Sequence, residues 1–189
     1  LDEGFAQHYL RTKVDLKSIW FASDSTKDWA EKEMLRPSMQ LPALFLIEYA
    51  LAKLWQSWGV QPDALVGHSA GENTVACIAG VMTFSECLAL ITLRGELFER
   101  VENSGMLSVN LSAAAIKVYL GDDLDLATVN APEQSTVAGR HDRLKQLKLE
   151  LDKQDIDAQI VPINIAAHSR LLDPILKEFS DFAATLDLK

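Results

Sequence analysis

A serine between two glycines is the feature of this sequence best suited to chemistry. Ser69 stands in the pattern Gly67-x-Ser69-x-Gly71, after the apolar run 64–66 and before the alanine-rich stretch 72–79. A strand, a sharp turn and a helix in this order form the setting of a nucleophile elbow, which exposes the hydroxyl at a helix N-terminus. Glycine on both sides lets the flanking segments pack closely. The alternative is a plain turn with a serine-capped helix.

A serine nucleophile needs a base, and the sequence contains four histidines. His8 lies in a polar N-terminal segment and is expected at the surface, and His141 is expected to open a helix. His68 adjoins Ser69, so we expect it to support the turn. His168 follows a predicted strand and stands in a loop. It is therefore the candidate base, although solvent exposure is the ordinary state of a loop histidine.

An arginine interrupts the apolar helical stretch 88–98. An unpaired charge buried among apolar side chains is strongly unfavourable, so Arg94 needs a partner or access to solvent. That partner could be Glu72 or Glu96. It could also be a substrate carboxylate, which a guanidinium binds through two parallel hydrogen bonds. Periodicity alone leaves these alternatives open.

Composition limits the classes of protein that the chain can belong to. Its 189 residues suit one domain, or one with a small inserted subdomain, and the net charge of −9 argues against nucleic-acid binding. The longest apolar run, 41–52, is shorter than the roughly 20 residues that cross a bilayer, so no membrane partner is expected. Two cysteines make neither a disulfide framework nor a metal site. We expect buried free thiols and a cytoplasmic protein.

The elements that would position these residues follow from periodicity. Helices are predicted over 28–35, 41–58, 72–79 and 84–102, the last opened by a capping box of Thr83 and Glu86. After Gly105 the pattern predicts strands and helices in the order β-α-β-β-α-β, which is that of a ferredoxin-like unit. The expected ranges are 106–111, 112–120, 124–129, 135–138, 141–154 and 157–163, before a final helix over 174–186.

Several motifs together point to one family. They are Gln40-Leu-Pro-Ala-Leu-Phe45, Trp58-Gly-Val-Gln-Pro-Asp63, Gly67-His-Ser-Ala-Gly-Glu72, Ala79-Gly-Val81, Leu93-Arg-Gly95, Asn130-Ala-Pro132 with Val137-Ala-Gly139, and Ala166-Ala-His-Ser169 with Asp173-Pro-Ile-Leu176. From about residue 38 to its end, the chain resembles the acyltransferase domains of modular polyketide synthases and the related malonyl-CoA:acyl carrier protein transacylases.

The resemblance implies a fold and four roles. The fold is α/β, with an α/β hydrolase-like large subdomain over 1–103 and 164–189 and a ferredoxin-like small subdomain inserted over 104–163. By position, Ser69 would be acylated and His168 would act as general base and acid. Ala70 would supply one oxyanion-hole N–H. Arg94, 25 positions after Ser69, would bind the carboxylate of malonyl-type substrates.

The resemblance also implies three further substrate-binding residues: His68, Asn130 and Ala167. The family's specificity marker ends at the histidine and reads Ile165-Ala-Ala-His168 here. Malonyl-selective domains often carry a bulky aromatic residue just before the histidine, and methylmalonyl-selective domains carry a serine. This sequence matches neither pattern. Ala167 leaves room for an alpha substituent, while malonyl is the commonest substrate and therefore the expected one.

The implied reaction moves a malonyl or methylmalonyl group from coenzyme A through an acyl-serine to the phosphopantetheine thiol of an acyl carrier protein, in polyketide or fatty acid biosynthesis. No tightly bound cofactor is implied, because the coenzyme A thioester is a substrate and the phosphopantetheine belongs to the carrier. Other domains of a synthase are implied as partners.

Two departures from the family keep other functions open. The family's Gly-Gln-Gly segment, whose glutamine provides the second oxyanion-hole N–H, has no match here, nor has the family's C-terminal strand and helix, so a chain clipped at both ends is expected. One alternative is a serine hydrolase or thioesterase, with Asp152, Asp155 or Asp157 as triad acid. Another is a non-catalytic docking fragment of a synthase.

Overall fold

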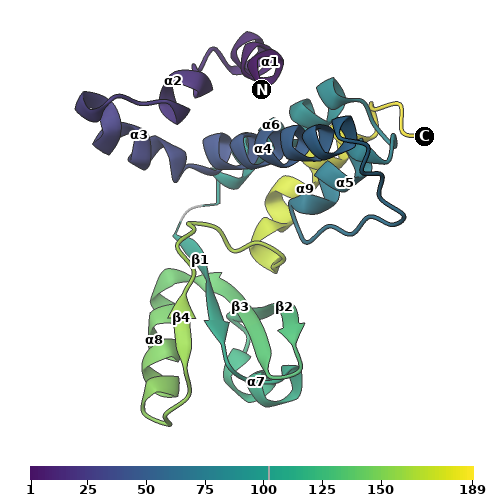
Figure 1. Ribbon diagram of the computed structural model, residues 1–189. Helices are drawn as coiled ribbons and strands as arrows, with labels where there is room; N and C mark the ends of the chain where they lie inside the picture. Colours follow the sequence, from purple (N-terminus) through teal and green to yellow (C-terminus); the bar gives the residue numbers. More distant parts are fainter. Residues whose placement is uncertain (102) are drawn as a thin grey trace. The chain divides into compact units, whose positions relative to one another are not determined.

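The computed structural model describes residues 1–101 and 103–189, which form two compact units (Figure 1). Unit 1 comprises Leu1–Leu97 and Glu178–Lys189, and unit 2 comprises Phe98–Lys177. None of the helices in the described part of the chain is long and apolar enough to cross a membrane.

The regular elements of unit 1 are all helices, and its described residues include no strand. Its elements are α1 (Asp2–Thr12), α2 (Leu16–Trp20), η1 (Asp24–Thr26), α3 (Lys27–Met34), α4 (Pro37–Ser57), α5 (Gly71–Ile78), most of α6 (Phe84–Phe98) and the second half of α9 (Asp173–Ala183). The capping box at the start of α6 is confirmed, because Glu86 Oε2 accepts from Thr83 N–H at 2.8 Å and Thr83 Oγ1 accepts from Glu86 N–H at 3.2 Å. Position 102, the predicted end of α6, lies outside the described residues.

The long helix α4 begins four residues before its predicted start. Pro37 occupies its first turn, where a missing N–H is harmless and the fixed φ suits a helix. Phe45 of α4 stacks on Phe84 at the start of α6, with ring centroids 5.5 Å apart.

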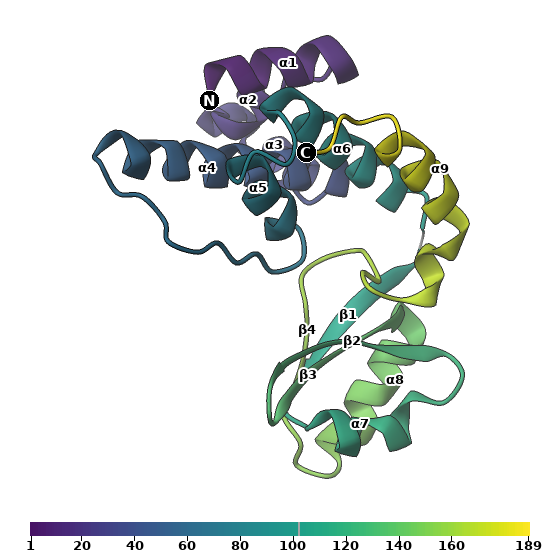
Figure 2. The ribbon, with the colours of Figure 1, turned by 90° about the vertical axis from the view of Figure 1, so that its right-hand side faces the viewer.

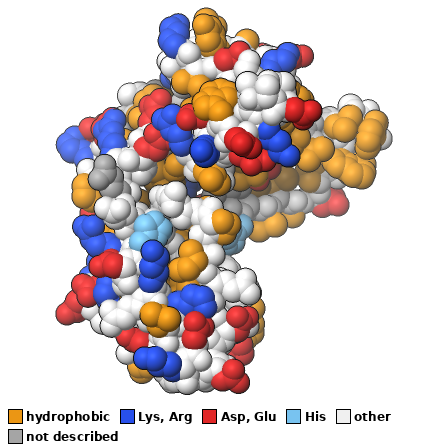
Figure 3. Space-filling model, turned by 90° about the vertical axis from the view of Figure 1, so that its left-hand side faces the viewer, with side chains coloured by type: hydrophobic (Ala, Val, Ile, Leu, Met, Phe, Trp, Pro, Cys, Tyr) orange, Lys and Arg blue, Asp and Glu red, His pale blue; other side chains and the backbone are white. Residues whose placement is uncertain are grey.

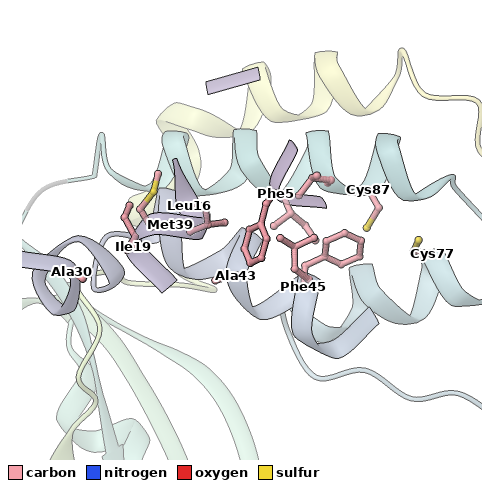
Figure 4. Packing of buried hydrophobic residues seen from close by; sticks show 12 residues of the cluster. Phe5, Leu16, Ile19, Ala30, Met39, Ala43, Phe45, Cys77 and Cys87 are labelled. Atoms are coloured by element: carbon pink, nitrogen blue, oxygen red, sulfur yellow. The ribbon is translucent and has the colours of Figure 1, made fainter. Parts of the chain in front are cut away.

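The core of unit 1 joins side chains of α1 to α6. Phe5, Leu16, Phe45, Cys77 and Cys87 belong to one buried cluster, which Figure 4 shows from close by. The two cysteines are buried and free, as predicted. Helices α5 and α6, which carry Ser69's turn and Arg94, therefore rest on one apolar core.

The burial of His8 differs from the prediction. It was predicted at the surface, but its side chain is completely buried. Helix α1 turns Gly4, Phe5 and His8 to the same buried face. The polar neighbours that suggested exposure lie on the other face, because residues four apart share a side of a helix.

The predicted strand at 64–66 does not form. The segment has no strand assignment, and Val66 is 93% exposed. A strand is stabilised by hydrogen bonds to a neighbouring strand, and the described residues of unit 1 contain none. The prediction therefore failed because local pattern cannot supply a pairing partner.

Hydrophobic side chains are exposed along the second half of α4 and the segment after it. They gather on one side of the space-filling view in Figure 3. The exposed large hydrophobic residues of this stretch are Leu51, Leu54, Trp55, Trp58, Val60, Leu65 and Val66. Contiguous exposed apolar surface is typical of interaction sites.

Unit 2 is a four-stranded antiparallel sheet with two helices. Its elements are β1 (Ser104–Val109), α7 (Ala113–Leu120), β2 (Leu124–Ala131), β3 (Gln134–Arg140), α8 (His141–Asp152) and β4 (Ala158–Ile160), followed by η2 (Arg170–Leu172). The strands lie in the order β2-β3-β1-β4. The predicted succession β-α-β-β-α-β is thus confirmed.

Both helices of unit 2 cover the same face of its sheet (Figure 2). Ile116 of α7 and Leu144 of α8 share a buried cluster with Leu107 and Val137 of the strands. Leu107 and Val137 are also directly paired across β1 and β3. Strand β1 of this sheet also carries Ser104, whose hydroxyl oxygen accepts the backbone N–H of Ala166 in the loop before His168.

Candidate functional site

The serine turn has the backbone of a nucleophile elbow, and Ser69 is half-buried. Ser69 has φ +53°, a left-handed conformation that is uncommon for a residue with a side chain. The N–H groups of Gly71, Glu72 and Asn73 donate to the carbonyls of His68, Ser69 and Ala70 at 3.0–3.1 Å. These bonds begin α5 and do not include the Ala70 N–H. Strained backbone of this kind, which stores about 1–3 kcal/mol, clusters at functional sites.

Only the first glycine of the pattern is required by close packing within this chain. A Cβ at Gly67 would lie 2.5 Å from Glu72 N and 2.6 Å from Gly71 C. A Cβ at Gly71 would meet nothing within 4 Å. The expectation that both glycines allow close packing therefore holds for Gly67 and is wrong for Gly71 within the described chain.

Helix α5 is held from two sides. Thr74 Oγ1 donates to Glu48 Oε2 of α4, and the Cys87 thiol of α6 donates to Asn73 O at 3.3 Å. Thr74 is 5% exposed, so its bond is shielded from water. The turn of Ser69 thus precedes a helix that is hydrogen-bonded to both α4 and α6.

Arg94 lies on α6 in a partly buried position. Burial lowers the pKa of its guanidinium, and the Glu72 carboxylate acts in the opposite direction. The neighbouring Gly95 lets α6 approach α4, since a Cβ there would lie 2.5 Å from Pro37 O. Of the partners considered from the sequence, Glu72 of α5 is the charge that acts on Arg94.

His168 also has a left-handed backbone, with φ +59°. It is exposed, whereas Ile165, Ala166 and Ala167 before it are buried. The Ser169 hydroxyl donates to Ala166 O at 2.6 Å, and Ala166 N–H donates to Ser104 Oγ at 3.1 Å. The exposed histidine thus sits at the end of a buried segment that is fixed to β1.

Asn130 lies near the end of β2. Its side-chain amide donates to Thr136 Oγ1 of β3 at 3.2 Å, across the hairpin that joins the two strands. The residue is exposed. Its hydrogen bond shows a structural role within the hairpin.

The candidate residues fall into two groups. His68, Ser69, Ala70 and Arg94 belong to unit 1, whereas Asn130, Ala167 and His168 belong to unit 2. Within unit 1, Glu72 lies in the first turn of α5, just after Ser69, and its charge raises the pKa of Arg94 against the larger lowering by burial.

A pair of residues at the His168 loop was not predicted from the sequence. Arg170 binds Asp125 of β2 through its backbone N–H at 2.9 Å and its Nε at 2.8 Å. The partners are 45 residues apart, so no local pattern signals the contact. The only hint in the sequence is a charged residue two positions after His168.

Comparison with known proteins gives the family. Residues 28–188 match the family model described as "Acyl transferase domain". The hybrid synthetase acdB of Aspergillus candidus, described as PKS-NRPS, is 38% identical over 78% of the chain. A component of the phenolphthiocerol/phthiocerol polyketide synthase of Mycobacterium tuberculosis is 31% identical over 98% of it. The chain spans 6% and 13% of these two relatives' own lengths.

Solved structures agree with this result. The acyltransferase domain of SpnD, in complex with 2-(pent-4-yn-1-yl)malonyl, is 35% identical and superposes with a TM-score of 0.88, over all of this chain and 44% of that one. FabD from Acinetobacter baumannii is 22% identical with a TM-score of 0.84, over 61% of its chain, and shows the same mixed α/β fold. The chain therefore belongs to the acyltransferase family of modular polyketide synthase domains and malonyl-CoA:acyl carrier protein transacylases.

Proposed function

We propose that this chain transfers a malonyl-type acyl group from coenzyme A to the phosphopantetheine thiol of an acyl carrier protein. The observation that carries the proposal is Ser69, held at positive φ in a turn that Gly67 closes against the start of α5. Such a turn presents a hydroxyl beside helix N–H groups, which stabilise negative charge on a thioester oxygen. Other domains of a synthase and a carrier protein are the proposed partners.

In the first half of the reaction, His168 accepts the proton of Ser69 as Oγ attacks the thioester carbonyl. The carbon–sulfur bond breaks, and the coenzyme A thiolate leaves with that proton. In the second half, His168 accepts the proton of the carrier's thiol, whose sulfur attacks the acyl-serine. The carbon–oxygen bond breaks, and Ser69 recovers its proton. Ala70 N–H would donate to the oxyanion in both halves.

Substrate recognition follows from charge and volume. Arg94 would bind the distal carboxylate, and its partly buried position supports this role because a charge interaction is stronger away from water. His68, Asn130 and Ala167 would line the acyl group. The small Ala167 leaves space for an alpha methyl, yet one methyl separates substrates by only about 1–3 kcal/mol. Malonyl is the proposed extender unit, with methylmalonyl as its competitor.

The proposed reaction implies the complete subdomain arrangement of the family. We propose an α/β hydrolase-like part over 1–103 and 164–189 and a ferredoxin-like part over 104–163, the latter supported by the element order of unit 2. The free thiols of Cys77 and Cys87 fit a reducing compartment, and we propose the cytoplasm.

Intact-protein mass after brief exposure to malonyl-CoA, or separately to methylmalonyl-CoA, tests the proposal. The expected result is an acyl adduct that Ser69→Ala abolishes and that moves to added carrier protein. The adduct is measured both in this chain and in the longest natural polypeptide that contains this chain. Hydrolysis of the thioester without any acceptor would favour a serine hydrolase. The absence of an adduct in both polypeptides would favour a docking role and reject the transferase.

A further inference from the structure

The loop of His168 is fixed on two sides. On the β1 side, Ala166 N–H donates to Ser104 Oγ, and the Ser169 hydroxyl closes back on Ala166 O. These bonds fix Ala166 to β1 and close the turn around His168 as far as Ser169. The direction of the chain from Arg170 onward depends on a second anchor.

The second anchor is formed by Asp125 of β2. Its Oδ2 accepts the backbone N–H of Arg170 at 2.9 Å, and its Oδ1 accepts Arg170 Nε at 2.8 Å. Arg170 Nη2 also donates to Asp122 O at 3.0 Å. One carboxylate therefore binds both the backbone and the side chain of the residue two positions after His168.

The contacts of Arg170 are important for the orientation of the loop and contribute little to the free energy of unfolding. The Arg170 side chain is 61% exposed, and exposed ion pairs contribute little to the free energy of unfolding. A planar guanidinium between a carboxylate and a carbonyl is, however, strongly directional. A positive φ at a residue with a side chain persists only where its surroundings determine it. Asp125 and Ser104 supply such surroundings on either side of His168.

We propose that Asp125 and Arg170 are positioning residues, which fix the backbone of His168 and so aim its imidazole. The inference rests on the proposed function, in which His168 is the base. Misplacing a catalytic group by about 1 Å can lower a rate about a hundredfold. Loss of the pair is therefore expected to reduce the rate of acyl transfer with little change in substrate affinity.

The test compares Asp125→Ala, Arg170→Ala and Arg170→Lys with the unchanged chain. At saturating acyl-CoA, the rate of Ser69 acylation should fall about tenfold to a hundredfold in both alanine variants, while the half-saturating concentration changes less than about twofold. Arg170→Lys keeps the backbone N–H and the charge but loses the planar fork, so an intermediate rate is expected. The double alanine variant should lose little more than either single one.

The NMR signal of the His168 imidazole tests the positioning role without requiring acyl transfer. The chain has four histidines, whose imidazole C–H signals can be resolved by NMR and assigned with a His168→Gln variant. Removal of Asp125 or Arg170 should shift or broaden the His168 signal and leave those of His8, His68 and His141 unchanged. Glu33→Ala is the matched control, because it removes a comparably exposed arginine–carboxylate contact, Arg36–Glu33 at 2.9 Å, from unit 1.

Wild-type acylation in both alanine variants would overturn the proposal, whatever the His168 signal does. If the unchanged chain forms no acyl-serine, the proposed function fails, and the His168 signal alone then decides whether Asp125 and Arg170 fix this residue. If an alanine variant unfolds, which all four signals would reveal, Arg170→Lys decides by the same two measurements.

Discussion

A Cβ at Gly67 would lie 2.5 Å from the backbone nitrogen of Glu72, so the segment that enters the serine turn touches the first turn of α5. No side chain can occupy that space without moving backbone on one side of the turn. The positive φ of Ser69 lies between these two residues. The left-handed backbone of Ser69 and the close approach of the two ends of its turn are therefore one structural feature.

Gly67→Ala is expected to destabilise the protein, and Gly71→Ala is the matched control. Overpacking against backbone costs about 1–3 kcal/mol, which lowers Tm by roughly 3–10 °C for a chain of this size. No described residue lies within 4 Å of a Cβ at Gly71, and alanine favours a helix more than glycine does, so the Tm of Gly71→Ala should stay equal or rise. Thermal unfolding of both variants checks this, and equal losses would contradict the steric account.

Cys77 and Cys87 are expected to resist thiol reagents in the folded chain. Cys87 is completely buried and Cys77 is 8% exposed. Contact with Cys77, together with burial, raises the pKa of the Cys87 thiol, and the reactive form is the thiolate. The same contact lowers the pKa of Cys77, so the resistance of Cys77 depends on its burial alone. Titration with a coloured disulfide reagent should therefore detect no thiol before denaturation and two after it. Rapid reaction of the native chain would show that α5 and α6 separate in solution.

Local patterns predicted unit 2 well. Its strands alternate and its helices repeat every three to four residues, so each element is encoded by neighbours in the sequence. The capping box of Thr83 and Glu86 is equally local, and its hydrogen bonds are present. The turn of Ser69 was predicted from the positions of its glycines, although only Gly67 is needed for packing.

The features that were predicted wrongly or missed depend on contacts between residues distant in the sequence. The run 64–66 has strand-like composition, but pairing needs a neighbouring strand that a local pattern cannot provide. His8 is buried because α1 packs one face on the core, which a mostly polar segment does not reveal. The bond between Asp125 and Arg170 crosses 45 residues. Spatial contacts of this kind set the details of a site without leaving a signal in spacing.

His8 should make stability depend on pH below neutrality. Burial lowers its pKa in the folded state, whereas in the unfolded chain the pKa is about 6.5. As pH falls through that value, the unfolded state binds a proton that the folded state resists, so stability decreases. Tm measured between pH 7.5 and 5.5 should fall less steeply in His8→Gln than in the unchanged chain. Parallel curves would show that His8 is accessible to protonation in the folded state.

Arg94→Ala should discriminate between acyl groups. If Arg94 binds the distal carboxylate, its loss removes a charge-assisted contact, and malonyl transfer should fall roughly 10- to 100-fold. Acetyl transfer, which needs no such contact, should change little. Arg94→Lys keeps the charge but cannot form two parallel hydrogen bonds to a carboxylate. Its rate of malonyl transfer should therefore lie between that of Arg94→Ala and that of the unchanged chain.

Glu72 needs its own control, because its negative charge acts on Arg94 and, in the proposed site, would face the substrate carboxylate uncompensated once the guanidinium is removed. The double variant Arg94→Ala with Glu72→Gln separates the two effects. If Glu72 repels the incoming carboxylate, the double variant should recover part of the malonyl activity that the single variant loses. If Arg94 binds the carboxylate directly, malonyl transfer stays low in both variants while acetyl transfer remains normal. Equal loss of malonyl and acetyl transfer in every Arg94 variant would instead assign this residue to the packing of α6.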